Sequence, residues 1–309
     1  MNGSSEPIMV SIRCLVYNHE PYLRQCLEGL VMQKTNFPFE VIVHDDVSTD
    51  NSVAIIKEYH SKYPHIIKPI FEEENLYSRH DWSLDRVVDS FTRGKYVATC
   101  EGDDYWIDPN KLQMQVDFME SHPDYALCFT SFKRSDGIKH RQHSYPDTDY
   151  EKYLIEGENV IGTLTTMYRK SIYDNLSKDY LSTTWKLGDL PLWIELSHAG
   201  KVKYIDKTTA IYRILPNSAS HSTNIESEIT FIENVQEVKQ FYNCKYGCKY
   251  KVIPPFAKKM KAAYMHNDKK KANIIAKESI CTGYLDCKLV VFYFGTIIPG
   301  LRKIINLYY

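Results

Sequence analysis

Apolar runs alternate with helical patterns through the first third of the chain. Each run ends in a polar loop, and the first three runs are followed by residues whose apolar side chains recur at helical spacing. A strand, a helix and a second strand in succession form a parallel pair, because the crossover returns the chain to the same end of the sheet. The alternation therefore predicts an α/β fold with a mostly parallel sheet flanked by helices. The expected strands are residues 8–16, 39–44, 66–71 and 96–100.

Polar residues stand directly after three of these expected strands. They occupy residues 17–21, 45–50 and 101–104. In open α/β sheets, ligands bind beyond the carboxyl ends of the strands. We therefore expect the three loops to form one site.

The overall charge argues against a nucleic-acid-binding protein. The formal net charge is -1 at pH 7, whereas binding to a phosphate backbone depends on a basic surface. The eight cysteines are scattered, mostly in apolar runs, which is typical of reduced thiols rather than of a disulfide framework. The start has no signal-peptide pattern and no stretch is apolar for long enough to span a bilayer, so we expect a cytoplasmic protein.

The segment Glu101-Gly102-Asp103-Asp104 has the chemistry of a metal site. Carboxylates are hard ligands that suit Mg²⁺ or Mn²⁺, and magnesium commonly uses one or two carboxylates together with substrate phosphates. A lone acidic pair is more often a solvated turn. Here the pair follows an apolar strand, has a glycine that lets a ligand approach the backbone, and leads into Tyr105-Trp106. We interpret the segment as a metal-binding loop with Mn²⁺ or Mg²⁺ as the cofactor.

The opening half resembles the family 2 inverting glycosyltransferases of GT-A fold, many of which build bacterial surface polysaccharides. Val10-Ser11-Ile12 leads to Val16-Tyr17-Asn18, and residues 39–52 are similar to the family pattern E-x-I-V-x-D-D-x-S-x-D-x-S/T. Gly94-Lys95-Tyr96-Val97 then leads to the acidic loop, so that the resemblance covers roughly residues 9–124. It implies a GT-A sheet and a nucleotide-sugar donor.

The resemblance implies a donor-binding role for residues after the first two strands. Tyr17 would stack on the donor base and Asp46 would accept its imide proton, a pairing that favours uracil or thymine. Asp45 and Glu20 would support this loop. Without the resemblance, Tyr17 is equally well a core aromatic and Asp46 a helix cap. Leu15 stands where some members of the family have a threonine.

The resemblance also divides the acidic loop between the ribose and the metal. Asp103 would contact the ribose of the donor. Asp104, the final acid of the family's D-x-D element, would hold the metal on the diphosphate. Glu101 replaces the aspartate that is often found at the first acidic position, and its role stays open.

An inverting transfer needs a carboxylate that takes the acceptor proton on the face opposite the leaving diphosphate. Gly188-Asp189-Leu190-Pro191 resembles the family segment that carries this base at a helix start. The resemblance implies Asp189 as the catalytic base. The alternative role for Asp189 is a simple N-cap, because aspartate caps helices and proline favours the first helical turn.

Two further residues are candidates for donor and metal binding. Arg79 lies in the polar loop between the third and fourth strands and would contact the ribose or diphosphate, with a solvated loop arginine as the alternative. Tyr212-Arg213 resembles a Tyr-Arg-x-His segment near the diphosphate, but Leu215 occupies the histidine position. His221 would supply the missing imidazole to the metal, or is an ordinary surface histidine.

The expected organisation is a GT-A domain over residues 8–225 and a helical region over residues 226–309. Within the first, residues 8–107 would form the nucleotide-sugar-binding half and residues 108–225 the acceptor-side half.

The expected helical region combines a basic block, residues 258–271, with an apolar run, residues 289–298. It either attaches the protein peripherally to the anionic inner face of the cytoplasmic membrane, or covers the catalytic lobe or the face of a homodimer.

The expected function is transfer of a sugar from a nucleotide-sugar donor, with a UDP-sugar favoured, to a hydroxyl of a glycan or lipid-linked saccharide. Such a reaction belongs to bacterial polysaccharide synthesis, as of a capsule or O-antigen. Two alternatives stay open. One is a sugar-nucleotide pyrophosphorylase, although residues 16–20 lack its glycine-rich loop. The other is a membrane-docked assembly subunit that has lost turnover.

Overall fold

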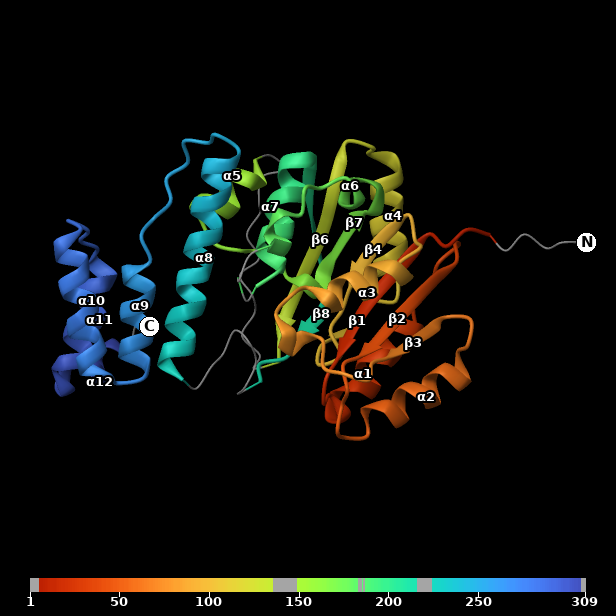
Figure 1. Ribbon diagram of the computed structural model, residues 1–309, viewed down its shortest axis with the longest axis horizontal. Coiled ribbons are helices and arrows are strands. Elements are labelled where there is room, and N and C mark those ends of the chain that lie inside the picture. Colours follow the sequence, from red (N-terminus) through yellow and green to blue (C-terminus); the bar gives the residue numbers. More distant parts are fainter. Residues whose placement is uncertain (1–5, 136–148, 183–184, 186, 216–223, 307–309) are drawn as a thin grey trace, which may run out of the picture. The chain divides into compact units, whose positions relative to one another are not determined.

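The structure is a computed structural model that describes residues 6–135, 149–182, 185, 187–215 and 224–306 (Figure 1). The chain forms two compact units. The first comprises Met1–Thr184 and Gly188–Ile214, and the second comprises Trp185–Leu187 and Leu215–Tyr309. We call them the sheet unit and the helical unit.

The sheet unit is built on one eight-stranded sheet in the order β3-β2-β1-β4-β7-β6-β8-β5. Its first four strands in this order are parallel, with Val10 of β1 opposite Phe39 of β2 on one side and opposite Tyr96 of β4 on the other. The predicted α/β fold with a mostly parallel sheet is confirmed. The strands are β1 (Val10–Val16), β2 (Phe39–Asp45), β3 (Ile67–Phe71), β4 (Tyr96–Thr99), β5 (Tyr105–Trp106), β6 (Tyr125–Arg134), β7 (Thr166–Arg169) and β8 (Lys201–Tyr212).

The central strands are buried on both faces. Every residue of β2 is buried, and in β1 only Leu15 is partly exposed. Helices cover the faces of a parallel sheet, which is why its strands read as continuous apolar runs in the sequence. The helices of this unit are α1 (Glu20–Val31), α2 (Ser52–Lys62), α3 (Ser83–Phe91), α4 (Lys111–Ser121), α5 (Tyr150–Glu156), α6 (Lys170–Asp174) and α7 (Asp189–Ala199).

The sheet changes direction at β7. This strand pairs antiparallel with β4 on one side and with β6 on the other, and β6 then runs parallel to β8. The alternating threonines of residues 162–169 would suit a single strand, but only the second half of this segment is extended. Thr163–Thr165 form a 3-10 turn, in which the Thr165 hydroxyl donates to the carbonyl of Gly162 at 2.6 Å. The threonine side chains therefore satisfy the local backbone rather than a strand ladder.

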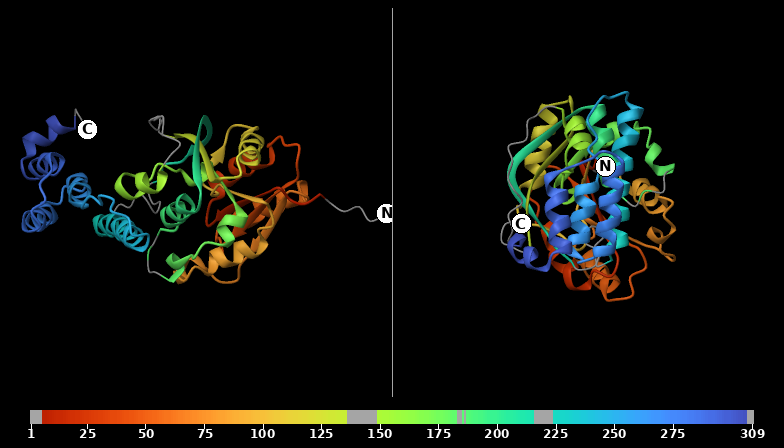
Figure 2. Two further views of the ribbon diagram at one scale, coloured as in Figure 1. Left: turned by 90° about the horizontal axis from the view of Figure 1, so that it is seen from above. Right: turned by 90° about the vertical axis from the view of Figure 1, so that its left-hand side faces the viewer.

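The helical unit has a core of its own. Figures 1 and 2 show its helices lying side by side, and Met260, Tyr264, Ile275 and Phe292 are buried among them. None of the helices in the described residues is both long enough and apolar enough to cross a bilayer. The helices are α8 (Ile225–Lys245), α9 (Phe256–Met265), α10 (Lys269–Cys281), α11 (Cys287–Ile297) and α12 (Pro299–Ile305).

Candidate active site

The loops after β1 and β2 are joined by hydrogen bonds at the carboxyl ends of their strands. The Asn18 amide N–H donates to the Ser48 hydroxyl at 2.9 Å, and the Asn18 side-chain oxygen accepts from the Thr49 amide at 2.7 Å. Asn18 has a φ of 55°, a left-handed conformation that asparagine tolerates better than most residues. Beside it, Tyr17 is 49% exposed, so this residue lies at the surface rather than in the core.

Glu20 is placed to hold this pair of loops. Its carboxylate accepts from the Asn51 backbone N–H at 3.1 Å and from the Asn51 side-chain amide at 2.6 Å. In return, the Asp50 carboxylate accepts from the Glu20 N–H at 2.9 Å. Glu20 therefore holds the loop after β2 in place through hydrogen bonds to Asn51.

Asp46 fixes a third loop. Its two carboxylate oxygens accept from the backbone N–H groups of Leu76 and Tyr77, at 2.7 and 3.0 Å. A carboxylate has about four acceptor positions, so these bonds leave capacity for a ligand N–H. Asp45 is buried next to it, and its Oδ2 accepts from the Ser48 N–H at 3.1 Å. Asp45 Oδ1 is buried without a hydrogen-bond partner among the described residues, which marks it as an acceptor available to a ligand.

Backbone strain gathers around the same loops. Non-glycine residues with positive φ include Asn18, Val47, His80 and Trp82, all of which follow the first three strands of the chain. Val47, with a φ of 65°, is unusual because a β-branched side chain crowds the backbone in this conformation. Such strain persists only where the surroundings enforce it, and it concentrates at functional sites.

The acidic loop after β4 forms a cluster of three carboxylates. Ligand oxygens of Glu101, Asp103 and Asp104 all lie within 4.8 Å of one another. Burial, followed by the charge of Asp103, raises the pKa of Asp104 to about 8. Burial and the charges of Asp103 and Asp189 raise the pKa of Glu101 to about 7. A divalent cation would offset both the repulsion and the desolvation, so these residues fit the expected Mg²⁺ or Mn²⁺ site.

Arg213, directly after β8, holds the acidic loop in place. Its backbone N–H donates to Asp104 Oδ1 at 2.7 Å, and its guanidinium donates to the Asp103 carbonyl and the Gln25 side chain. The guanidinium also lies 4.5 Å from the centre of the Tyr105 ring. Because Arg213 occupies only one oxygen of Asp104, the other stays available to a metal.

Asp189 is the first residue of α7. Its Oδ1 accepts from the Leu190 N–H at 2.7 Å and its Oδ2 accepts from the Asn159 side-chain amide at 3.2 Å. Burial raises its pKa. The charge of Asp189 contributes to the raised pKa of Glu101, so the expected base and the acidic cluster share one electrostatic environment.

Trp82 stands beside the start of α7. A methyl group built at Gly188 would lie 2.7 Å from the Trp82 ring, so a larger residue would displace the indole. Trp82 comes from the loop between β3 and α3, and it therefore brings an aromatic surface next to Asp189.

Arg79 and His221 are not placed with this cluster. The guanidinium of Arg79 pairs with Glu74 and its side chain is 45% exposed, within a 3-10 turn of the loop after β3. His221 lies in residues 216–223, outside the described part of the chain. The prediction that it binds the metal therefore stays a prediction.

Sequence reasoning did not assign roles to several residues that the structure brings to this site. Glu101 completes the carboxylate cluster, and its position at the start of the acidic loop was the available signal. His19 lies against Gly102, where a methyl group would come within 2.7 Å of His19 Nδ1, an atom that is buried without a hydrogen-bond partner in the described chain. Trp82 gave no signal, because its loop has no regular pattern.

Comparison with known proteins identifies the family of this chain. The model of a family described as glycosyl transferase family 2 matches residues 11–177. The chain belongs to this family. Membership sets aside the sugar-nucleotide pyrophosphorylase alternative.

Similar proteins occur in several bacteria. This family 2 chain is 34% identical over 222 residues to an uncharacterized protein of Mycobacterium tuberculosis, a match that covers 69% of this chain and 61% of the relative. The chain thus spans less than two thirds of that relative's length. It is 30% identical over 211 residues to Bacillus subtilis EpsE, which is named as a glycosyltransferase, and this match covers 68% of the chain and 73% of EpsE.

Solved structures support the GT-A fold. TarS of Staphylococcus aureus in complex with UDP-GlcNAc has a TM-score of 0.57 at 17% identity, covering 94% of this chain and 79% of the TarS chain. A mannosyltransferase from Pyrobaculum calidifontis in complex with GDP-Man and Mn²⁺ has a TM-score of 0.55 at 14% identity, covering 99% and 88%. At these identities the likeness concerns the fold.

Proposed function

We propose that this family 2 member is a metal-dependent inverting glycosyltransferase that uses a nucleotide-sugar donor, with a UDP-sugar favoured. Its acceptor is a hydroxyl of a glycan or lipid-linked saccharide in bacterial polysaccharide synthesis. The observation that carries the proposal is the cluster of Glu101, Asp103 and Asp104 next to Asp189 at the carboxyl ends of the strands.

The donor base is held by the loops after β1 and β2. The exposed ring of Tyr17 offers a stacking surface, and stacking on an aromatic side chain contributes about 1–3 kcal/mol per base. Asp46, and the unpaired Oδ1 of Asp45, offer acceptors for an imide N–H, which uracil and thymine have. The UDP-GlcNAc bound to TarS supports this choice of donor class. Arg79 would have to leave Glu74 to reach a phosphate.

The diphosphate is held at the acidic cluster. Asp104, with Asp103 and Glu101 beside it, would bind Mn²⁺ or Mg²⁺, which would neutralise the charge that develops on the leaving diphosphate. The Mn²⁺ in the Pyrobaculum mannosyltransferase supports this proposal. Arg213 orients Asp104 through its backbone N–H.

The acceptor hydroxyl is activated by Asp189. Its position at the first turn of α7, held by the Leu190 N–H and Asn159, keeps the carboxylate fixed while its raised pKa makes it a stronger base than an exposed aspartate. Trp82 offers an apolar face on which a sugar ring can stack beside it.

The eight free cysteines support a reducing, cytoplasmic setting for this reaction. A homodimer stays a prediction.

The proposal is tested by donor turnover. Purified protein is incubated with a panel of UDP-, dTDP- and GDP-sugars, saccharide acceptors and either Mn²⁺ or EDTA, and nucleoside diphosphate release is measured. We expect release with a UDP-sugar that stops in EDTA and in Asp104→Ala. Asp117→Asn, which removes an exposed carboxylate of α4, is the matched control and should keep its activity.

Two results count against the proposal. Full turnover by Asp104→Ala removes the metal assignment. Calorimetry that detects no binding of UDP in the presence of Mn²⁺ would favour the inactive assembly subunit, because a protein without turnover need not retain metal-linked nucleotide binding.

A further inference from the structure

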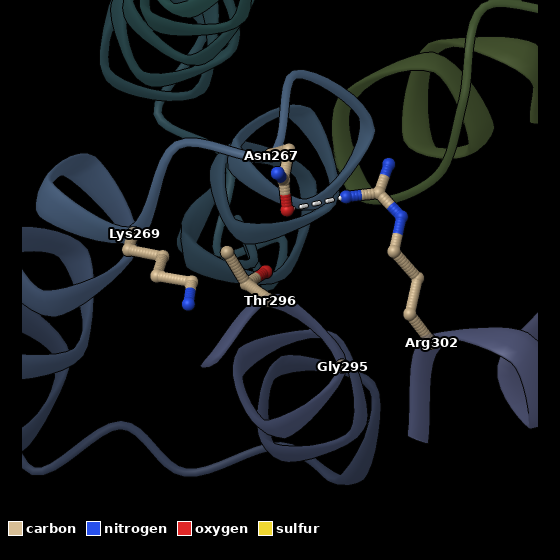
Figure 3. A pocket seen from close by; sticks show the side chains of 5 residues that line it. All are labelled: Asn267, Lys269, Gly295, Thr296 and Arg302. Carbon is tan, nitrogen blue, oxygen red and sulfur yellow. Dashed lines mark hydrogen bonds between the residues drawn. The ribbon is translucent and has the colours of Figure 1, made fainter. Parts of the chain in front are cut away.

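A pocket of about 330 Å³ lies within the helical unit. Its lining comes from the turn between α9 and α10, the first residue of α10, the end of α11 and the middle of α12. Figure 3 shows Lys269 and Arg302 on opposite sides of Thr296, with Asn267 between them. The lining residues are Asn267, Lys269, Gly295, Thr296 and Arg302.

The pocket is cationic and contains no carboxylate in its described lining. Arg302 donates to Asn267 Oδ1 at 2.7 Å and to the Met265 carbonyl at 3.3 Å, and its guanidinium lies 4.8 Å from the centre of the Tyr264 ring. All three partners are neutral, so they orient the guanidinium without cancelling its charge.

Lys269 differs in its ion pairing from two other lysines of this unit. Lys259 and Lys271 form ion pairs with Glu233 and Glu226, at 2.5 and 2.7 Å. Lys269 makes no ion pair to any residue that the structure describes. The two cations of the pocket are therefore both available to an anion, and Asn267 and Thr296 add polar groups beside them.

The surroundings of the pocket favour a lipid as the source of that anion. Residues 256–306 include ten lysines and arginines but only three aspartates and glutamates. Exposed apolar side chains stand next to the lining residues in the sequence: Met265 is 61% exposed, Ile298 46% and Phe294 42%. Cationic groups that border exposed apolar side chains suit the interface of an anionic membrane, where the charges meet headgroups and the apolar groups enter the acyl boundary.

We propose that this pocket binds the phosphate of an anionic phospholipid headgroup between Lys269 and Arg302. Met265, Phe294 and Ile298 then contact the acyl boundary. Guanidinium and ammonium groups form charge-assisted hydrogen bonds with phosphate oxygens, and these bonds are stronger than those between neutral groups. The proposal is independent of sugar transfer, because it concerns residues of the helical unit alone.

The test measures binding of the full chain to vesicles by co-sedimentation. Vesicles of phosphatidylcholine alone are compared with vesicles that also contain phosphatidylglycerol, at constant salt. Lys269→Gln with Arg302→Gln is compared with Lys261→Gln with Lys277→Gln, which removes the same charge from exposed lysines of α9 and α10 outside the pocket. We expect the wild type to bind only the anionic vesicles, and the pocket variant to lose at least tenfold more affinity than the control variant.

Equal losses in the two double variants would overturn the proposal, since attraction to a diffuse basic surface depends on charge and not on position. Equal binding to neutral vesicles would overturn it as well. Protection against thermal unfolding by glycerol 1-phosphate, without vesicle binding, would assign the pocket to a free phosphate and also refute the lipid. Lys269→Gln alone against Lys277→Gln alone repeats the comparison without touching Arg302, whose contacts with Tyr264 and Met265 contribute to folding.

Discussion

Replacing Asp104 by asparagine should stabilise the protein when no metal is bound. The side chain is buried, and burial with the neighbouring Asp103 raises its pKa from 3.8 to about 8. A carboxyl group whose pKa is higher in the folded state stabilises that state at low pH, and the stability is lost as the pH rises through the folded value. A shift of about 4 pKa units corresponds to roughly 6 kcal/mol as an upper limit. Asparagine keeps the acceptor for the Arg213 N–H without the charge.

The raised pKa values of Asp104 and Glu101 also determine how the stability depends on pH. Between about pH 5 and pH 7, Asp104 and Glu101 each take up protons on folding, and each lowers the free energy of unfolding by up to about 1.4 kcal/mol per pH unit. In Asp104→Asn only the contribution of Glu101 remains. Water that enters the site reduces the contributions of Asp104 and Glu101 below this limit. We therefore expect the free energy of unfolding of Asp104→Asn to fall less steeply with pH than that of the wild type, by about 1 kcal/mol per pH unit.

Urea unfolding in EDTA at pH 5, 6, 7 and 8 measures this slope. Tryptophan fluorescence reports on the sheet unit, because Trp82, Trp106 and Trp193 belong to it and only Trp185 belongs to the helical unit. Asp117→Asn, the exposed control, should keep the wild-type slope. Addition of Mn²⁺ should stabilise the wild type and leave Asp104→Asn unchanged, since a ligand that binds the folded state raises its stability by mass action.

Two results would refute this reasoning. One is that the free energy of unfolding of Asp104→Asn depends on pH as steeply as that of the wild type. The other is a lower stability of Asp104→Asn than of the wild type at pH 8 in EDTA. Either result would mean that ionisation of the buried Asp104 carboxyl group does not lower the free energy of unfolding.

Asp189→Asn should lower kcat by at least about 100-fold while calorimetry shows unchanged binding of UDP and Mn²⁺, because a general base contributes 10²–10⁴-fold to a rate; substantial transfer would remove Asp189 as the base. In the wild type, a pH profile of kcat/KM should fall toward acid at a pH above the usual aspartate range, since burial raises the pKa of Asp189 and its protonated form cannot accept a proton. Tyr17→Ala should weaken UDP binding by about tenfold or more, whereas Tyr17→Phe, which keeps the stacking face, should bind normally. Gly102→Ala should lower the stability by about 1–3 kcal/mol in thermal unfolding, because its methyl group meets His19 Nδ1 at 2.7 Å; an unchanged Tm would show that His19 moves aside freely.

The parallel half of the sheet was predictable because its signal is local. Each strand that is buried on both faces reads as a continuous apolar run, and the polar residues that follow it must lie at the same edge. Asp46 and Asp104 were found in this way. Their hydrogen bonds to the backbone of Leu76, Tyr77 and Arg213 were not, because those partners are distant in the sequence.

The second half of the sheet has weaker local signals. The short strand β7 follows a 3-10 turn. The alternating threonines of this turn are equally common in a strand, so the sequence does not distinguish a strand from a turn that is capped by threonine hydroxyls. Nothing local states that β7 pairs antiparallel between β4 and β6. Trp82 likewise lies against Gly188 because its backbone is left-handed, and no residue pattern in the sequence predicts this conformation.

The position of β7 has a consequence for how such enzymes diversify. The strand joins β4 to β6 through main-chain hydrogen bonds, which any side chains permit outside proline. Residues on either side of β7, including Asn159 before it and the first turn of α7 after it, can therefore be exchanged by recombination between relatives while the acidic cluster keeps its backbone support. Under the proposed function, such exchanges would change the acceptor while the donor-binding loops stay the same, so β7 is the place at which chimeric proteins should be joined.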